Sequence, residues 1–315
     1  MAAVRSRIRI ASVSQWSEPL TRAYATCEAV VRAHYENFPV ASRLLPAPMR
    51  PHVAAVYAFA RIADDIADEG NAPAAERQAE LRQWQERVHR AAEGPVASAP
   101  AANRDEHIAY ALGHSIRSLG LPLALFDDLL SAFAQDTMVT RYASWAEVFD
   151  YCRRSANPVG RLVLRIGGYH DDGLDRSSDA LCTALQLTNF WQDFGRDWHA
   201  GRLYVPKDVQ AACGATEADL STRPLNAAWT RALGRAVDVT RAQFEEGRLV
   251  CDGVKGRLRV ELRFTWLGGA RILERVDRQK SALLDDRPTL GAADLPALLW
   301  QAVRWRTATR DGAGA

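Results

Sequence analysis

The sequence predicts an all-α protein, a single-domain bundle of helices around a central apolar cavity. Three observations indicate this fold class. Alanine and leucine dominate the composition, alternation of β-branched residues is scarce, and apolar residues recur at helical spacing along the chain. The 315 residues, 48% hydrophobic and 25% charged, allow one large domain or two small ones with a sizeable core.

The first half of the chain reads as helices separated by short breaks. The predicted helices span residues 21–33, 50–69, 74–92, 105–119 and 123–137. Pro39 excludes a helix in the polar loop after the first of them, and residues 93–103 form the clearest loop. Gly120 and Pro122 separate the last two helices.

The second half continues the helical pattern with more interruptions. Helices are expected at 147–154, 161–168, 181–197, 225–247, 258–283 and 293–307, with a break at 155–160 and a turn and extended piece at 198–206. Gly268 and Gly269 interrupt the penultimate helix at a cost of about 2 kcal/mol relative to alanines, which close packing or space for an apolar ligand would offset. We expect a flexible N-terminus at 1–20, the folded domain at 21–307 and a disordered tail at 308–315.

Charge and cysteine usage exclude several classes. The net charge of +2 gives no field that would attract nucleic acid. The cysteines are far apart and form no metal-binding cluster with histidine, which indicates buried free thiols in a reducing compartment, the cytoplasm. The N-terminus lacks the apolar region of a signal peptide, and no run approaches a transmembrane helix. Peripheral contact with the inner membrane stays open.

The most informative stretch is 181–197, LCTALQLTNFWQDFGRD. As a helix it places Asn189, Asp193 and Asp197 at i, i+4 and i+8 on one face, with Gln186 one turn earlier. Ser177, Ser178 and Asp179 just upstream are candidates for its N-cap. Gly195 lies inside the row, where it weakens the helix or lets another group approach the backbone.

A second acidic row occurs at 57–69, YAFARIADDIADE. Asp64 and Asp68 are one turn apart, with Asp65 and Glu69 beside them in a largely apolar helix. Burying such carboxylates costs several kcal/mol each unless cations neutralise them. Oxygen ligands in this number suit Mg²⁺, and two such helices facing each other would hold a diphosphate. A lone DDxxD is commonly a solvated helix face; the pairing of two rows makes the signal specific.

This arrangement predicts ionisation of an allylic or similar diphosphate, with the metals neutralising the leaving pyrophosphate and apolar walls sheltering a carbocation. Arg61 and Arg202 would add positive charge, although Arg202 could instead pair with Asp197. Four aromatic residues near the rows could stabilise a cation or could be plain core: Tyr57, Phe59, Phe190 and Trp191.

The motifs resemble those of the squalene/phytoene synthase family of all-α isoprenoid synthases. The resemblance covers about residues 21 to 290 and rests on 57–69, YCRRSANPVGRLVL (151–164), 186–197 and GRLYVP (201–206). It implies one helical isoprenoid synthase domain, Mg²⁺ and an isoprenoid diphosphate substrate. The implied metal ligands, of which the aspartates are also the catalytic residues, are Asp64, Asp68, Asn189, Asp193 and Asp197. The implied substrate-binding residues are His34, Asn37, Arg61, Tyr151, Gln186 and Arg202.

The motifs HYENFPVAS (34–42), SANPVG (155–160), NFWQDFGRD (189–197) and TWLGG (265–269) resemble, within the family, the bacterial hydroxysqualene synthase branch of hopanoid pathways. That resemblance implies a carbon–oxygen lyase that rearranges presqualene diphosphate to hydroxysqualene, with release of pyrophosphate and no need for NADPH. Condensing members carry arginine where this chain has Gln192, a tyrosine where it has Arg153 and Arg154, and another tyrosine near Gly269. The missing arginine fits a substrate with a single diphosphate.

Two other functions stay open. The chain could join two prenyl diphosphates head to head, as a squalene or phytoene synthase, but then Gln192 and Arg153 depart from the expected pattern. A non-catalytic assembly factor of the same fold normally lacks the aspartates, and both rows are intact here. Expected partners are the isoprenoid diphosphate and no nucleic acid, with membrane contact and handover to other squalene-pathway enzymes left open.

Overall fold

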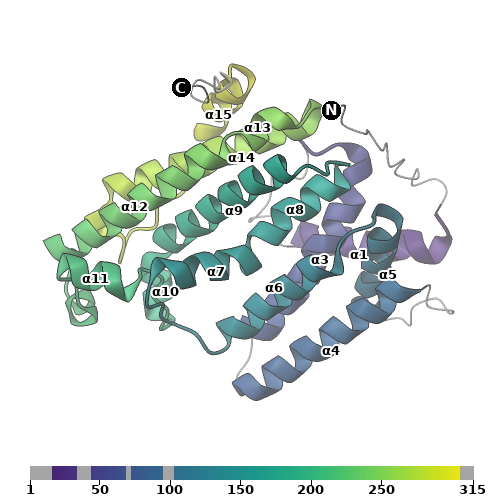
Figure 1. The fold of residues 1–315 in the computed structure, drawn as a ribbon, viewed down its shortest axis with the longest axis horizontal. Helices are drawn as coiled ribbons and strands as arrows, with labels where there is room; N and C mark the ends of the chain where they lie inside the picture. The colour runs from purple at the N-terminus through teal and green to yellow at the C-terminus, as the bar shows by residue number, and fades with distance from the viewer. Residues whose placement is uncertain (1–15, 34–43, 69–71, 95–102, 306–315) are drawn as a thin grey trace. The chain divides into compact units, whose positions relative to one another are not determined.

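The computed structural model describes residues 16–33, 44–68, 72–94 and 103–305. The protein is all-α, as predicted (Figure 1). Within the described residues the β-type pairing is limited to an isolated bridge between Arg141 and Leu203. No helix in this part of the chain is both long enough and apolar enough to cross a membrane.

The described helices group into two compact units. The first unit contains the chain up to Met138 together with Pro158–Asp171. Its helices are α1 (Glu18–Ala33), η3 (Ala47–Met49), α3 (Arg50–Asp68), α4 (Ala74–Glu93), α5 (Arg104–Leu119), α6 (Leu123–Asp136) and α8 (Asn157–Ile166) from its second residue onward. α3 packs against α1, α4, α5 and α6, so the helix with the first acidic row is the central one of its unit.

The second unit contains Val139–Asn157 and the chain from Asp172 onward. Its helices are α7 (Trp145–Ser155), α9 (Asp172–Gln192), α10 (Phe194–His199), α11 (Lys207–Cys213), η4 (Glu217–Ser221), α12 (Ala227–Gly247), α13 (Val250–Gly253), α14 (Gly256–Arg278), η5 (Lys280–Ala282) and α15 (Asp294–Val303). α9 packs against α7, α10, α12, α13 and α14. The second acidic row therefore also lies on the central helix of its unit.

Two predicted breaks differ from the structure. The break at 155–160 is confined to Ala156, because Pro158 lies in the first turn of α8, where a helix tolerates proline. The penultimate helix, α14, is not interrupted at its glycines. A Cβ on Gly269 would lie 2.5 Å from Leu185 of α9, so close packing accounts for this glycine.

The start of the second acidic helix was predicted wrongly. α9 begins at Asp172, and Ser177 and Ser178, proposed as N-cap candidates, lie inside it and are buried. The Ser177 hydroxyl donates to the Glu246 carbonyl at 3.0 Å and accepts from the Val250 backbone N–H at 2.8 Å. It therefore joins α9 to the end of α12 and the start of α13.

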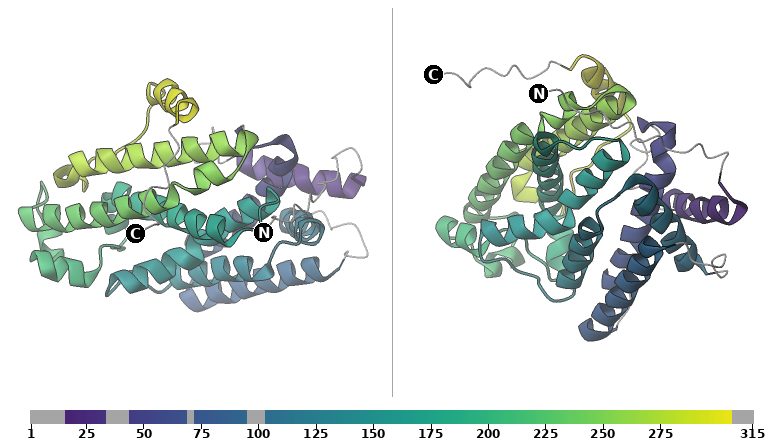
Figure 2. Two further views of the ribbon diagram at one scale, coloured as in Figure 1. Left: turned by 45° about the horizontal axis from the view of Figure 1, so that its top comes forward. Right: turned by 45° about the vertical axis from the view of Figure 1, so that its right-hand side comes forward.

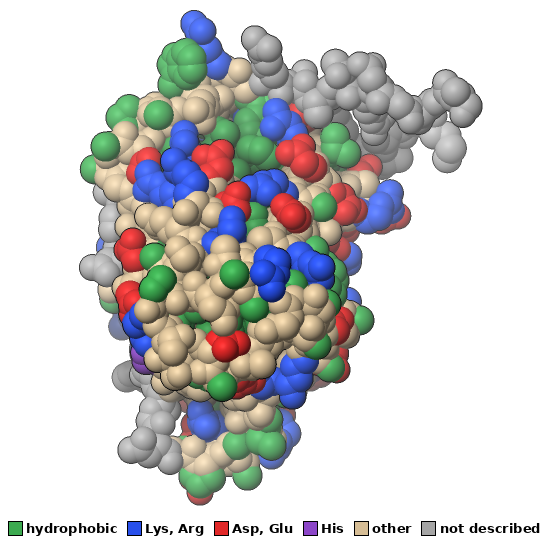
Figure 3. Space-filling view, turned by 90° about the vertical axis from the view of Figure 1, so that its left-hand side faces the viewer, with side chains coloured by type: hydrophobic (Ala, Val, Ile, Leu, Met, Phe, Trp, Pro, Cys, Tyr) green, Lys and Arg blue, Asp and Glu red, His purple; other side chains and the backbone are tan. Residues whose placement is uncertain are grey.

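The cysteines agree with the sequence-based expectation of buried free thiols. Basic and acidic side chains are interspersed on the face drawn in Figure 3. All the cysteines are free thiols, and all but Cys182 are buried. Burial raises the pKa of the Cys27 and Cys152 thiols to about 12, which keeps them protonated and unreactive. Of the N-terminal segment proposed at 1–20, residues 1–15 lie outside the described residues, as does the tail proposed at 308–315, and α1 begins at Glu18, three residues before the predicted start.

Candidate active site

The first acidic row lies near the end of α3. Asp64 and Asp68 are one turn apart, and Arg61 lies one turn before Asp64. Arg61 Nη1 donates to Asp64 Oδ2 at 2.9 Å, and Nη2 forms an ion pair with Asp65. The side chains of Arg61 and Asp65 are only 21% and 25% exposed. Their charges are therefore partly desolvated, and electrostatic attraction is stronger there than in open water.

An apolar pocket of about 480 Å³ shares α3 with this row. Its apolar wall consists of Val31, Leu45, Val53, Ala54, Val56, Tyr57, Ala60, Val159, Leu162, Val163 and Ile166, with Glu28, Arg32 and Arg50 also lining it. Tyr57 and Ala60 lie within two turns of Asp64 on the same helix. Burial raises the pKa of Tyr57, so its phenol stays neutral. The first unit thus combines an apolar pocket with an acidic row.

The aromatic residues suggested as cation stabilisers separate into two groups. Tyr57 lines the apolar pocket. Phe59 is fully buried and packs edge-on against Phe126, with ring centroids 5.3 Å apart. Phe190 stacks on Tyr204 at 3.7 Å, and Trp191 is fully buried. Packing explains these last three aromatic residues, whereas Tyr57 alone of the four lines the described pocket.

The second acidic row crosses the junction of α9 and α10. Asp193 itself is the residue between the two helices, with φ −95° and ψ 14°. Its backbone N–H nevertheless donates to Asn189 O, and the Asp197 N–H donates to Asp193 O, each at 2.8 Å. These bonds preserve the one-turn spacing across the junction, so Asn189, Asp193 and Asp197 share a face as the sequence indicated.

An arginine that was not predicted from the sequence, Arg287, contacts Asp193 of this row. Arg287, which follows η5, donates from Nη2 to Asp193 Oδ2 at 3.2 Å and from Nε to Oδ1. Arg196 adds a weaker contact to Asp193 at 3.8 Å. The Arg287 and Asp193 side chains are 34% and 27% exposed. A bidentate contact between a guanidinium and a carboxylate requires a strict geometry. It shows that positive charge stabilises the Asp193 carboxylate at this position.

Gln192 holds the segment that carries Arg287. Its Nε2 donates to the Pro288 carbonyl at 2.6 Å, and the glutamine is buried. A Cβ on Gly195 would lie 2.3 Å from the Leu284 carbonyl oxygen, so this glycine permits the same segment to approach the helix. Of the two expectations for Gly195, backbone approach is the correct one. No local sequence signal pointed to Arg287, because its contact with Asp193 depends on how this segment folds back onto α9.

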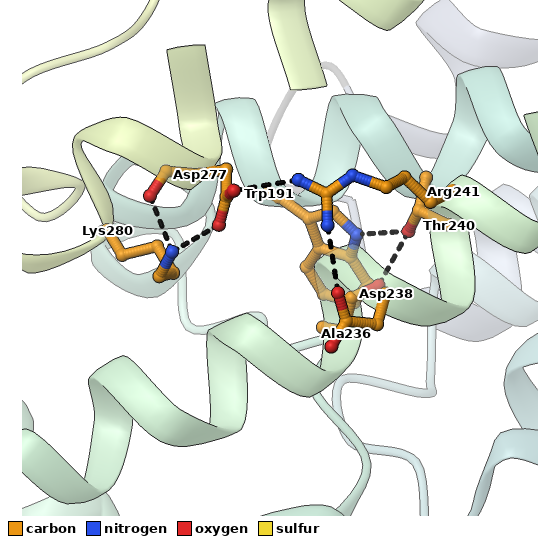
Figure 4. A network of polar contacts seen from close by, with 7 residues as sticks. All are labelled: Trp191, Ala236, Asp238, Thr240, Arg241, Asp277 and Lys280. Atoms are coloured by element: carbon orange, nitrogen blue, oxygen red, sulfur yellow. Dashed lines mark hydrogen bonds and ion pairs between the residues drawn. The ribbon is translucent and has the colours of Figure 1, made fainter. Parts of the chain in front are cut away.

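The acidic end of α9 is fixed by a polar network (Figure 4). Trp191 Nε1 donates to Thr240 Oγ1 on α12 at 2.8 Å, and Thr240 donates to Ala236 O. On the adjoining surface, Arg241 of α12 binds Asp277 of α14 at 2.7 Å. The network joins α9 to α12 and α12 to α14, so Asn189 and Asp193 stand beside an anchored tryptophan on a rigid element.

The remaining predicted substrate-binding residues occupy different surroundings. Tyr151 is buried beside the rings of Tyr142 and Phe190, at 5.8 and 6.1 Å. Gln186 lies on α9 and is half-buried. The backbone N–H of Arg202 donates to Asp197 O at 2.7 Å, which places this arginine next to the second row through its main chain. His34 and Asn37 lie outside the described residues.

The donor set fits Mg²⁺ if substrate completes the coordination. In the described part of the chain, no group of three or more His, Cys, Asp or Glu side chains is placed to hold a metal ion. Mg²⁺ commonly takes one or two carboxylates and completes its octahedron with water and phosphate oxygens. Each row carries carboxylate oxygens, the atom type that Mg²⁺ prefers, and guanidinium groups contact Asp64 and Asp193. The carboxylates are thus arranged to attract cations.

Comparisons with known proteins agree with this description. The family model for squalene/phytoene synthase matches residues 31–294. A hydroxysqualene synthase from Zymomonas mobilis is 44% identical over 190 residues, 59% of each chain, and one from Rhodopseudomonas palustris is 35% identical over 223 residues, 70% of this chain and 72% of the relative. The crystal structure of squalene synthase HpnC from Alicyclobacillus acidocaldarius superposes with a TM-score of 0.76 at 38% identity, over 86% of this chain and 97% of the other.

The chain belongs to the squalene/phytoene synthase family, whose all-α isoprenoid synthase fold it shares. Its resemblance to the hydroxysqualene synthase branch is also confirmed, since the curated relatives above carry that name. The matched segment spans about three fifths of the Zymomonas protein's length.

Proposed function

We propose that this protein is a Mg²⁺-dependent hydroxysqualene synthase that converts presqualene diphosphate to hydroxysqualene and pyrophosphate, for squalene and hopanoid biosynthesis. The observation that carries the proposal is the buried hydrogen bond from Gln192 to Pro288. This bond holds the uncharged Gln192 side chain against the Pro288 segment. Position 192 therefore offers no basic group to a second diphosphate. The relatives named hydroxysqualene synthase support the same reaction.

In this proposal each acidic row binds diphosphate oxygens through magnesium. Asp64, Asp68, Asn189, Asp193 and Asp197 would hold magnesium, which would supply Lewis-acid neutralisation of the leaving pyrophosphate. Arg61 and Arg287 stand against the rows and contribute positive charge where the leaving group develops negative charge. Gln186 and Arg202 extend the polar surface along the second row.

The hydrocarbon chains would occupy the apolar pocket between α1, α3 and α8. The carbon–oxygen bond breaks, and its electron pair leaves with pyrophosphate. The cyclopropyl cation rearranges and a water molecule adds to it, losing a proton to solvent or pyrophosphate. Valine, leucine and isoleucine side chains keep other water away from the cation, and the neutral phenol of Tyr57 presents a π-face to it. Because the carbon–oxygen bond is the one that breaks, the proposed enzyme is a carbon–oxygen lyase acting on a diphosphate.

The test is product analysis with purified protein, Mg²⁺ and no NADPH, using presqualene diphosphate in one reaction and farnesyl diphosphate in another. We expect hydroxysqualene from the first and no product from the second, and chelation of Mg²⁺ should stop turnover. Presqualene diphosphate or a phytoene-type hydrocarbon formed from a prenyl diphosphate would show instead that the protein is a condensing synthase.

A further inference from the structure

The first acidic row contains one aspartate, Asp65, that has no part in the proposed coordination of magnesium. Its side chain is 25% exposed, whereas that of Asp64 is 42% exposed and Asp68 is an exposed residue. Asp64 and Asp68 lie one turn apart on α3, and Asp65 is displaced from Asp64 by about 100° around the helix axis. Asp65 is thus the least exposed of these three aspartates, and it points in a different direction from Asp64.

Both carboxylate oxygens of Asp65 face arginine side chains. Oδ1 forms an ion pair with Nη2 of Arg61, one turn earlier on α3, and Oδ2 lies 3.9 Å from Nη2 of Arg104, the first residue of α5. α3 and α5 pack side by side within the first unit (Figures 1 and 2). The Asp65 carboxylate is therefore directed at cations of its own unit.

Arg61 uses its two terminal nitrogens on two consecutive carboxylates. Nη1 donates to Asp64 Oδ2 at 2.9 Å, while Nη2 pairs with Asp65. Because the guanidinium is planar and its N–H groups form a rigid fork, a pair at Nη2 also fixes the direction in which Nη1 points. Arg61 keeps this direction if Asp64 turns to another ligand, since the pair with the less exposed Asp65 remains.

A role for Asp65 as a third metal ligand does not fit this geometry. Among the residues that the structure describes, no three His, Cys, Asp or Glu side chains are grouped to hold a metal ion, so Asp64, Asp65 and Asp68 do not form such a group. Mg²⁺ commonly takes one or two carboxylates, and in the proposed function Asp64 and Asp68 supply them. Asp65 is then left to Arg61.

We propose that Asp65 is a positioning residue, which holds Arg61 towards the diphosphate and does not bind the metal. The inference rests on the proposed function, in which Arg61 contributes positive charge to the leaving group. Nη1 of Arg61 can pass from Asp64 to a diphosphate oxygen, while the pair with Asp65 keeps the guanidinium in place. Without Asp65, this long side chain would have to be ordered anew each time a substrate binds.

Calorimetric titration of pyrophosphate into the full-length protein with saturating Mg²⁺ tests the proposal without turnover. Asp65→Asn, which keeps the size of the side chain and removes its charge, should weaken pyrophosphate binding by about tenfold. Arg61→Met should weaken it by at least as much. The double variant should bind no more weakly than Arg61→Met alone, because Asp65 acts through Arg61. Asp65→Glu restores the charge one turn from Arg61 and should bind more tightly than Asp65→Asn.

A Mg²⁺ titration, at pyrophosphate concentrations that saturate each variant, separates positioning from metal binding. Asp64→Asn should raise the half-saturating Mg²⁺ concentration by at least about tenfold, whereas Asp65→Asn should leave it unchanged. The matched control is Asp127→Asn. Asp127 lies on α6, outside the acidic row, and pairs with His89 at 2.7 Å with 35% of its side chain exposed. This variant should match the wild type in both titrations.

The proposal is overturned if the wild type does not bind pyrophosphate with Mg²⁺, if Asp65→Asn binds it as tightly as the wild type, or if the effects of Asp65→Asn and Arg61→Met multiply in the double variant. An equal rise in the half-saturating Mg²⁺ concentration for Asp65→Asn and Asp64→Asn would also overturn it, because Asp65 would then be a metal ligand. A wild type that binds pyrophosphate but forms no hydroxysqualene would contradict the proposed function alone, so the two failures are distinguishable.

Discussion

At the residue scale, the side chain at position 192 determines which residue supplies positive charge to the second acidic row. Gln192 binds the Pro288 carbonyl, and the neighbouring Arg287 reaches back to Asp193. Position 192 thus supplies no positive charge to the row, and a guanidinium comes from a residue 94 positions further along the chain. In the proposed reaction Arg287 neutralises Asp193 before substrate binds and contacts the leaving pyrophosphate afterwards.

Arg287→Ala should therefore lower kcat on presqualene diphosphate by about two orders of magnitude, the effect typical of losing one preorganised contact to developing negative charge. The change removes no core volume, so circular dichroism and the melting temperature should stay close to those of the wild type. Steady-state kinetics at saturating Mg²⁺ measure the effect.

The control for this variant is Arg223→Ala. Arg223 binds Asp285, two residues before Arg287, at 2.6 Å in an exposed pair. It tests whether loosening the segment is enough to slow the reaction. Equal rate losses in the two variants, or a normal rate in Arg287→Ala, would contradict the role given to Arg287.

At the element scale, α14 carries a buried carboxyl on its packed face. Leu258, Ile272, Leu273 and Val276 are buried on this helix, and so is Glu261, at 4% exposure. The Thr265 side chain hydrogen-bonds to the Glu261 carboxyl group. The Oε2 atom of Glu261 has no hydrogen-bond partner among the described residues. Burial raises the pKa of Glu261 from 4.5 to about 8, so the folded protein holds this group protonated at neutral pH.

The pH dependence of stability follows from this raised pKa. Unfolding at pH 7 releases the Glu261 proton, so this group makes the free energy of unfolding fall as pH rises from about 4.5 to about 8. Glu261→Gln keeps the shape and removes the ionisation. We expect it to raise the free energy of unfolding at pH 8 by roughly 1–3 kcal/mol and to flatten the decline.

Urea denaturation across this pH range measures the difference between the two proteins. Glu245→Gln, on the exposed side of α12, serves as the control and should leave the curve unchanged. Parallel pH curves for wild type and Glu261→Gln would contradict the assignment of a buried neutral acid.

Local sequence signals predicted most elements but not those governed by distant contacts. The bounds of α3, α4, α5 and α12 follow apolar periodicity and breaks such as Gly120, whose φ of 62° ends α5. The start of α9 was missed because Ser177 and Ser178 resemble caps, whereas both are buried inside the helix and Ser177 bonds to α12 and α13. Similarly, α14 continues through Gly269 because Leu185 packs there, a contact that no local pattern reveals.

In the candidate site, too, the features set by local spacing were predicted and those set by distant contacts were not. Both acidic rows were predicted because i, i+4 spacing is a local property of a helix, and it is preserved even across the junction at Asp193. Arg287 was not predicted, since its contact with Asp193 depends on how the segment after η5 folds back onto α9. The apolar pocket likewise combines α1, α3 and α8, which are far apart in sequence.

At the scale of the whole molecule, we propose that the protein ionises one diphosphate ester and that water then adds to the resulting carbocation. Each unit has a central helix that ends in an acidic row contacted by arginine. The first unit adds an apolar pocket lined by the same helix. In the proposed reaction the polar rows hold the leaving group, while the pocket holds the hydrocarbon and limits water to the one molecule that reacts.

The most direct test is to run the reaction on presqualene diphosphate with Mg²⁺ in water enriched in ¹⁸O, with Asp193→Ala as the inactive control. Mass spectrometry of the products then locates the bond that breaks. We predict hydroxysqualene with the label in its hydroxyl group and pyrophosphate without it, because the carbon–oxygen bond breaks and water adds to carbon. Label in the phosphate product, with an unrearranged and unlabelled alcohol, would show cleavage at phosphorus and contradict the account.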